Sequence, residues 1–131
     1  MSKKAVTLQY STIFLNIFKL KYGVAGMQGW RKSMEDSHIS VLDIEQDVSI
    51  FGVFDGHGGC EVAIFVGNHF VEELKKTEAF RKADYKNALI ETFLSLDRML
   101  LTDAGKKELA LINKKNLVGG GSAVSGADLP Y

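Results

Sequence analysis

The sequence predicts an α+β fold with a mainly antiparallel sheet, because strand-like segments come first along the chain and helical patterns follow. The strand-like segments are residues 21–27, 37–44 and 48–54, and after Gly59 the apolar residues recur at helical spacing. The short polar turn 45–47 joins the last two strands, which favours an antiparallel hairpin. Alternating strand–helix–strand units, which are typical of parallel sheets, do not fit this order.

Length and composition indicate one soluble globular domain. The chain has 131 residues, of which 46% are hydrophobic, and its 16 basic residues balance its 16 acidic ones. Without a basic excess, the composition does not point to a nucleic-acid partner. The single cysteine, Cys60, excludes an internal disulfide framework and fits a reducing compartment, so we expect the protein in the cytoplasm or nucleus.

Residues 1–20 are a leader with two interpretations. Residues 11–20 are apolar and follow two lysines, as in a signal peptide, but Asn16 and Lys19 interrupt the apolar run and no small-residue cleavage site follows. The run is also too short to span a bilayer. It is interpreted as an edge strand or loose leader, or else as a segment in peripheral contact with a membrane.

Each predicted strand has its own sequence pattern. Residues 21–27, KYGVAGM, are strand-like and run into a glycine-bearing turn, and residues 28–36 form a polar connection around Trp30. Residues 37–44, SHISVLDI, alternate in polarity. Residues 48–54, VSIFGVF, are rich in β-branched and aromatic residues, which is typical of a buried strand.

Two amphipathic helices follow the hairpin. A first helix after Gly59 has a predicted apolar face made of Val62, Ala63, Val66, Phe70, Val71 and Leu74. A second helix at about residues 82–101 has a predicted apolar face made of Tyr85, Leu89, Phe93, Leu96 and Leu100. Both faces are interpreted as core packing. Residues 102–116 indicate a turn and a short polar helix.

Acidic residues gather at one end of the predicted hairpin. Glu35 and Asp36 precede its first strand and Asp55 follows its second, so antiparallel pairing brings all three to the same edge. Three neighbouring carboxylates repel one another unless a cation neutralises them, and hard-oxygen sites suit Mg²⁺ or Mn²⁺. The Gly56 carbonyl adds another possible ligand.

Two further residues suit phosphate chemistry. Arg31 lies four residues before Glu35, and its planar guanidinium matches two phosphate oxygens. His57 could donate a proton to a leaving alkoxide near neutral pH. These residues are interpreted either as a two-metal phosphoester hydrolase site or as separate turns with solvated acids.

Two sequence blocks resemble a known family. YGVAGMQGWRKSMEDSH, followed by FGVFDGHGG, is similar to the start of the type 2C metal-dependent serine/threonine protein phosphatases, which show Y-G-x-x-x-M-Q-G-W-R-x-x-M-E-D and then an apolar strand into D-G-H-G-G. The resemblance covers about residues 21–116. It implies an antiparallel β-sandwich with flanking helices and two Mg²⁺ or Mn²⁺ ions at one end, of which this chain holds the first strands and two helices.

The resemblance also implies roles for the residues of the site. Glu35 matches a direct metal ligand, Asp55 matches the aspartate that bridges both metals, and Gly56 matches a carbonyl ligand. Asp36 matches a neighbour that supports the site through water.

Two more matched residues act on the substrate. Arg31 matches the arginine that holds the substrate phosphate, and His57 matches the proposed general acid. The implied reaction is direct attack of an activated water on phosphoserine or phosphothreonine in proteins, without a phosphoenzyme.

The chain also departs from the family pattern. Family domains are much longer, and their later strands carry further metal-binding aspartates that this sequence lacks. Residues 119–124 resemble the start of the next family strand, but residues 125–131 diverge. We therefore expect a leader at 1–20, a partial catalytic domain at 21–124 and a divergent tail. The expected protein is an incomplete phosphatase of weak or no activity, or alternatively a non-catalytic phosphoprotein-binding or regulatory fragment.

Overall fold

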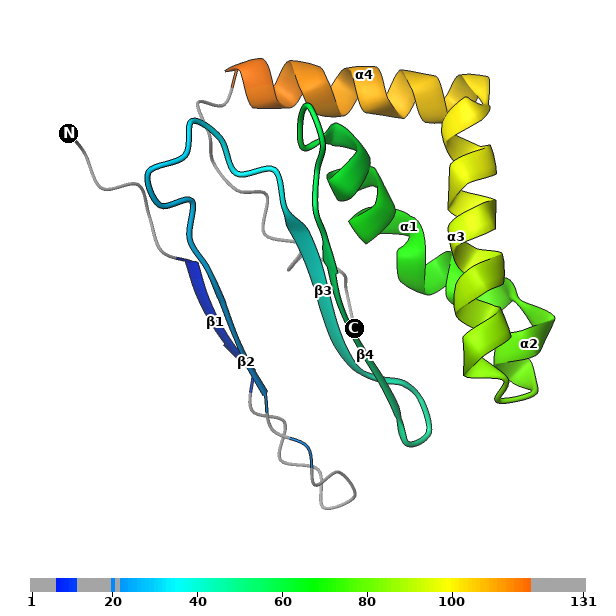
Figure 1. Ribbon diagram of the computed structural model, residues 1–131. Coiled ribbons are helices and arrows are strands. Elements are labelled where there is room, and N and C mark those ends of the chain that lie inside the picture. Colours follow the sequence, from blue (N-terminus) through cyan, green and yellow to red (C-terminus); the bar gives the residue numbers. More distant parts are fainter. Residues whose placement is uncertain (1–6, 12–19, 21, 119–131) are drawn as a thin grey trace.

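A computed structural model describes residues 7–11, 20 and 22–118 (Figure 1). The elements run in the order β1 Thr7–Ser11, β2 Tyr22–Gly26, β3 Ser37–Glu45, β4 Val48–Phe54, α1 Glu61–Lys76, α2 Glu78–Arg81, α3 Tyr85–Leu101 and α4 Asp103–Val118. Strands precede helices and the strand pairs are antiparallel, so the predicted α+β class is confirmed.

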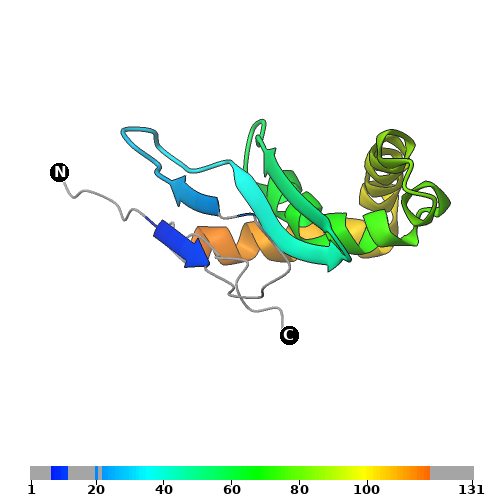
Figure 2. The same ribbon diagram turned by 90° about the horizontal axis from the view of Figure 1, so that it is seen from below.

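The described strands form two antiparallel pairs, β1 with β2 and β3 with β4. In both views the β1–β2 pair lies on one side of the β3–β4 hairpin, and α2 and α3 lie on the other (Figures 1 and 2). Each pair has only two strands, so the described strands do not build the two-sheet sandwich that the resemblance implies.

Part of the leader pairs with the first predicted strand. β1 pairs with β2 from Thr7 opposite Gly26 to Ser11 opposite Tyr22, so it shares only Ser11 with the apolar run that was interpreted as an edge strand. Residues 12–19, most of the apolar run considered for membrane contact, lie outside the described residues. In the part of the chain that the structure describes, no helix has the length and apolar character needed to cross a membrane.

The predicted hairpin is present, with β3 one residue longer than expected. Ser37 pairs with Phe54 at one end and Glu45 with Val48 at the other, and the register shifts between Val41 and Glu45. Asp47 in the connecting turn has a φ of 62°, a left-handed conformation that Asp and Asn adopt more readily than most residues.

α1 covers one face of the hairpin and forms the centre of the core. The buried side chains include Ile39 and Ile44 of β3 with Phe65 and Phe70 of α1. The rings of Phe54 and Phe70 lie 5.3 Å apart, which joins the end of β4 to the middle of α1. Phe65 was not on the predicted apolar face, whereas the predicted Val62 is 49% exposed.

The predicted second helix, at about residues 82–101, begins three residues later than expected. A separate turn of helix, α2, ends at Arg81, and α3 begins only at Tyr85. The reason is local: the Asp84 carboxylate accepts a hydrogen bond from the Asn87 amide at 3.3 Å and so acts as the N-cap of α3. Ala83, just before it, has a φ of 58° and cannot continue a helix.

The buried face of α3 also differs from the predicted one. Ala88, Thr92 and Leu96 are buried, while Tyr85, Leu89 and Phe93 are 46%, 40% and 52% exposed. Small side chains at two of the three buried positions let α3 approach its neighbours closely, which the larger predicted residues would prevent. The buried Thr92 hydroxyl donates to the Ala88 carbonyl at 2.7 Å, so its polarity is satisfied.

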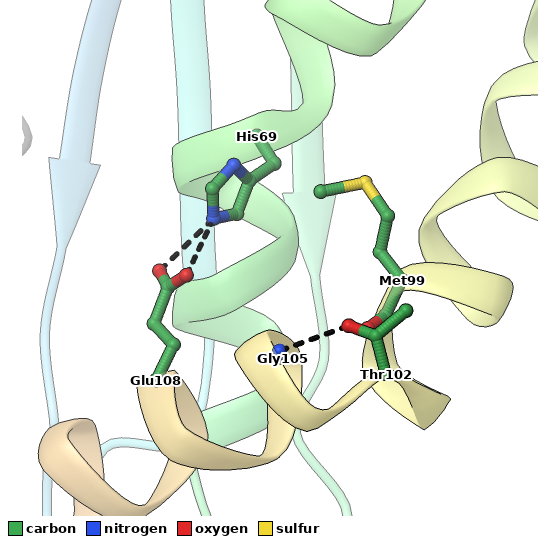
Figure 3. Close-up of polar contacts among 5 residues, drawn as sticks. All are labelled: His69, Met99, Thr102, Gly105 and Glu108. Carbon is green, nitrogen blue, oxygen red and sulfur yellow. Dashed lines mark hydrogen bonds and ion pairs between the residues drawn. The ribbon is translucent and has the colours of Figure 1, made fainter.

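α4 is longer than the short polar helix expected, with 16 residues. Thr102 caps it, because its Oγ1 accepts a hydrogen bond from the Gly105 amide at 3.0 Å (Figure 3). A Cβ at Gly105 would lie 3.2 Å from the Leu100 Cα, so α3 and α4 meet at a tight corner. From this corner α4 turns back toward the start of α1 (Figure 1).

Candidate active site at the end of the hairpin

The hairpin register brings the predicted acidic residues to one end of the molecule. Asp36 directly precedes the pair Ser37–Phe54, and Asp55 directly follows it. This end lies opposite the hairpin turn and next to the start of α1 (Figure 1). Glu35 lies one residue further along the incoming chain.

Glu35 and Gly56 are in direct backbone contact. A Cβ added to Gly56 would lie 2.5 Å from the Glu35 carbonyl oxygen and 3.0 Å from the Glu35 Cβ. No side chain fits at Gly56 unless one segment moves. The chain entering β3 and the chain leaving β4 are therefore packed against each other beside Asp55.

Two consecutive glycines turn the chain from β4 into α1. Gly58 has a φ of 76° and Gly59 a φ of 148°, conformations that residues with a Cβ rarely adopt. A Cβ at Gly59 would also collide with the Glu61 carboxylate. The D-G-H-G-G motif thus has a conformational reason: it reverses the chain within a few residues and leaves Asp55 and His57 exposed.

Short polar contacts hold the incoming loop. The Ser33 hydroxyl donates to Glu35 Oε1 at 2.9 Å, and Glu35 is partly buried. The Gln28 side-chain amide donates to the Arg31 carbonyl at 2.8 Å. The Arg31 backbone is therefore held in a turn while its side chain stays exposed to solvent, as is that of Asp36.

The three predicted carboxylates do not converge into one cluster. Among the described residues, no three His, Cys, Asp or Glu side chains lie close enough together to hold a metal ion. The register gives a reason. Continued past Ser37 and Phe54, it sets Asp36 opposite Asp55 and Glu35 opposite Gly56, and successive residues of an extended chain point to opposite faces. Glu35 and Asp55 therefore share an end of the sheet without sharing a face.

Other residues of this region gave little signal in the sequence. A Cβ at Gly67 of α1 would lie 2.6 Å from Ser37 Oγ and 3.9 Å from the Phe54 ring, so α1 crosses closely over the strand pair next to the site. A glycine inside a helical pattern was the available clue to such an approach. The Cys60 thiol accepts a hydrogen bond from the Asn116 side-chain amide at 3.0 Å, a contact that no local pattern indicates.

The surroundings of the Cys60 thiol favour its protonated form. Burial, and next the nearby Glu61 carboxylate, raise the pKa of this thiol above its ordinary value. The thiol therefore stays protonated near neutral pH and is a poor nucleophile. Its contribution at this position is packing and hydrogen bonding.

Comparison with known proteins adds an independent finding. A family model described as "Protein phosphatase 2C" matches residues 20–125. The chain is 56% identical over 91 residues to "Probable protein phosphatase 2C 4" of Paramecium tetraurelia, covering 70% of this chain and 30% of the relative. It is 58% identical over 88 residues to "Protein phosphatase 2C 1" of the same organism, covering 67% and 29%.

The similarity extends to plants. "Probable protein phosphatase 2C 58" of Oryza sativa subsp. japonica is 46% identical over 103 residues, which cover 78% of this chain and 28% of the relative. The matched segment thus spans about 30% of the length of the Paramecium relatives. Every described residue of the hairpin end lies inside the part that the family model matches.

Proposed function

Since the chain belongs to the protein phosphatase 2C family, we propose that it acts in the metal-dependent hydrolysis of phosphoserine and phosphothreonine in proteins. The observation that carries this proposal is the hairpin end inside the family-matched segment, where Gly56 contacts Glu35 and Asp55 lies next to Gly56 in the chain. Exposed acidic and basic side chains at this end leave it accessible to a protein substrate.

The donor set fits a hard divalent cation. Glu35 and Asp55 provide carboxylate oxygens and Gly56 provides a carbonyl oxygen, ligands that suit Mg²⁺ and Mn²⁺ better than softer metals. We assign Asp36 a supporting role through water, because it borders the same strand pair. When bound, such ions supply positive charge at the phosphate and acidify a water molecule.

Arg31 and His57 act on the substrate in this proposal. The Arg31 guanidinium binds two phosphate oxygens. Gln28 holds the Arg31 backbone through a hydrogen bond to its carbonyl. His57 donates a proton to the leaving seryl or threonyl oxygen, and its exposed position after Gly56 lets it reach a bound ester.

The proposed complete architecture is a sandwich of two sheets. On the face of β4 turned away from α1, Phe51 is 47% exposed and Val53 is 73% exposed. The Tyr22 ring of β2 already packs edge-on against Phe51, with ring centroids 5.1 Å apart. Exposed apolar strand residues next to a second strand pair support a second sheet on this side.

The boundaries and location of the protein remain those of the sequence interpretation. We propose a leader at 1–20, a phosphatase segment at 21–124 and a divergent tail at 125–131. We also propose a cytoplasmic or nuclear location, with membrane contact of the leader as a hypothesis that flotation with lipid vesicles tests.

The 131-residue chain is expected to be a weak catalyst by itself. It contributes Glu35 and Asp55 as direct carboxylate ligands, and its described acidic side chains form no larger cluster. Two-metal hydrolysis needs both ions held a few ångströms apart. Arg31 can bind phosphate without them, so phosphopeptide binding is the second candidate function.

Phosphate release from a phosphothreonine peptide in Mn²⁺ separates the two candidates. Asp55→Asn should abolish the release, while Asp47→Asn, the same change at the opposite end of the hairpin, should leave it intact. Absence of release together with peptide binding that Arg31→Ala removes would favour the binding function. Absence of both would contradict the proposal.

A further inference from the structure

The last turns of α4 contact the loop that carries the site. Asn116 Nδ2 donates a hydrogen bond to Cys60 Sγ at 3.0 Å, and both residues are partly buried. Cys60 directly follows the Gly58–Gly59 turn and is the N-cap residue of α1. A residue near the end of the described chain is thus joined to the loop that begins at Asp55.

Cys60 is an unusual residue for the position that it occupies. Side chains at N-cap positions ordinarily accept hydrogen bonds from the free amides of the helix, but the Cys60 side chain makes no such bond. Its carbonyl still accepts the first helical bond, from the Ile64 amide at 2.9 Å. The backbone therefore starts the helix, and the thiol is turned to α4 instead.

A second polar contact holds α4 on α1. His69 Nε2 lies 2.9 Å from both carboxylate oxygens of Glu108 (Figure 3), and the His69 ring packs on the buried Phe65 with centroids 4.5 Å apart. The two contacts are separated by about 13 Å along α1 and about 12 Å along α4, at 1.5 Å per residue. These lengths match for helices that run in opposite directions, so the geometry accommodates both contacts at once.

The loop between the site and α1 depends on its flanking residues. Gly58 and Gly59 have no side chains that could hold their left-handed turn. On one side of the turn, Gly56 is packed against Glu35. On the other side, Cys60 is bonded to Asn116.

We propose that Asn116 is a positioning residue of the active site: through its hydrogen bond to Cys60 it fixes the Gly58–Gly59 turn and so keeps Gly56, which follows Asp55, against Glu35. The effect of Asn116 on catalysis rests on the proposed phosphatase function. The contact between Asn116 and Cys60 does not depend on that function. This contact gives a role in the site to α4, an element that carries none of the family-matched ligands.

Hydrogen exchange of the loop amides tests this role without any metal. In the full 131-residue chain, Asn116→Ala should speed exchange at residues 56–60 by about fivefold, the effect of losing one modest hydrogen bond. Asn113→Ala, the same change at an exposed position of α4, should have no effect. Cys60→Ser keeps an accepting atom and should preserve the exchange rates of the unaltered chain, whereas Cys60→Ala should behave like Asn116→Ala.

Glu108→Gln distinguishes positioning from general docking of α4. It weakens the His69 contact, far from the loop, and should lower the unfolding temperature while leaving exchange at residues 56–60 unchanged. Equal acceleration of the loop in Glu108→Gln and Asn116→Ala would overturn the proposal. An unchanged loop in Asn116→Ala would overturn it as well.

Mn²⁺ binding then links the loop to the site. The Mn²⁺ affinity, measured by electron paramagnetic resonance, should fall severalfold in Asn116→Ala and stay unchanged in Asn113→Ala. Equal Mn²⁺ affinities of the unaltered chain and Asp55→Asn would contradict the proposed function. The exchange measurement would still decide the role of Asn116 in that case.

Discussion

Replacing Gly56 by alanine should separate the two segments that form the active site. The added Cβ would collide with the Gly59 carbonyl oxygen and would lie 2.5 Å from the Glu35 carbonyl oxygen, whereas ordinary van der Waals contact begins at 3.4 Å. The chain before β3 or the chain after β4 must therefore move by about 1 Å, because the Glu35 carbonyl oxygen and Cβ cannot turn away without moving the backbone. Overpacking of this kind typically costs about 1–3 kcal/mol, against less than about 1 kcal/mol gained from the stiffer unfolded chain.

The expected result combines lower stability with a larger loss of function. We expect the free energy of unfolding to fall by about 1–2 kcal/mol. Each kcal/mol lost should lower the unfolding temperature by about 3–6 °C for a chain of this size. A displacement of about 1 Å between Glu35 and Asp55 should reduce Mn²⁺-dependent phosphate release by on the order of a hundredfold. Thermal unfolding, Mn²⁺ titration and peptide hydrolysis measure the three effects.

Gly23→Ala is the matched control for this prediction. In the part of the chain that the structure describes, no atom beyond the two chain neighbours of Gly23 lies within 4 Å of a Cβ built there, so the same substitution should be neutral or slightly stabilising. If Gly56→Ala kept the unfolding temperature and the Mn²⁺ affinity of the unaltered chain, the contact between Glu35 and Gly56 would have no role in forming the site.

Three further predictions concern the elements around the site. Thr102→Ala should lower the free energy of unfolding by about 1 kcal/mol in urea, because it removes the cap of α4, whereas Thr102→Ser should not. Gly67→Ala should cost a similar amount, about 1 kcal/mol, and the double variant with Ser37→Ala should recover it, because Ser37 Oγ is the obstacle at 2.6 Å. The hydrogen bond from Lys76 lowers the pKa of Glu73, so the ionised carboxylate stabilises the fold above its unfolded pKa and this contribution disappears as the pH falls through the folded pKa. Below a pH of about 4.5, the stability difference between the unaltered chain and Glu73→Gln should therefore shrink; a difference independent of pH would refute this assignment.

The hairpin was predictable because its residues specify both strands and turn. Residues 48–54 are rich in β-branched and aromatic side chains, and the polar turn before them fixes the pairing partner. The observed strands Ser37–Glu45 and Val48–Phe54 agree with the prediction to one residue. Local pattern and tertiary structure favour the same arrangement here.

The faces of α3 were not predictable by the same reasoning. Helical periodicity selects the most apolar stripe, which contains Leu89 and Phe93, but the structure buries Ala88 and Thr92 next to it. Close packing of two helices favours small side chains at the crossing, and the identity of the neighbour is not encoded locally. The sequence therefore indicated the helix correctly and placed Leu96 and Leu100 in or against the core, but the rest of its predicted buried side is exposed.

Contacts between distant residues account for what else was missed. Cys60 and Asn116 are 56 positions apart, and His69 and Glu108 are 39 apart. Neither pair belongs to a motif, and α4 is polar enough to be mistaken for a short surface helix. Leu109 and Ile112 of α4 pack against the core, and two specific side-chain pairs add to this contact. Single-residue patterns carry no information about such pairs.

For the active site, the sequence predicts where the acidic residues lie along the hairpin, but not the direction in which their side chains point. The order of acids along a hairpin predicts that Glu35 and Asp55 reach one end of the sheet, because antiparallel pairing allows no other outcome. Whether their side chains meet depends on whether the strand register places them on the same face of the sheet. Here the register sets Glu35 opposite Gly56, not opposite Asp55. A glutamate, longer by one methylene than an aspartate, is suited to reach around that edge toward Asp55.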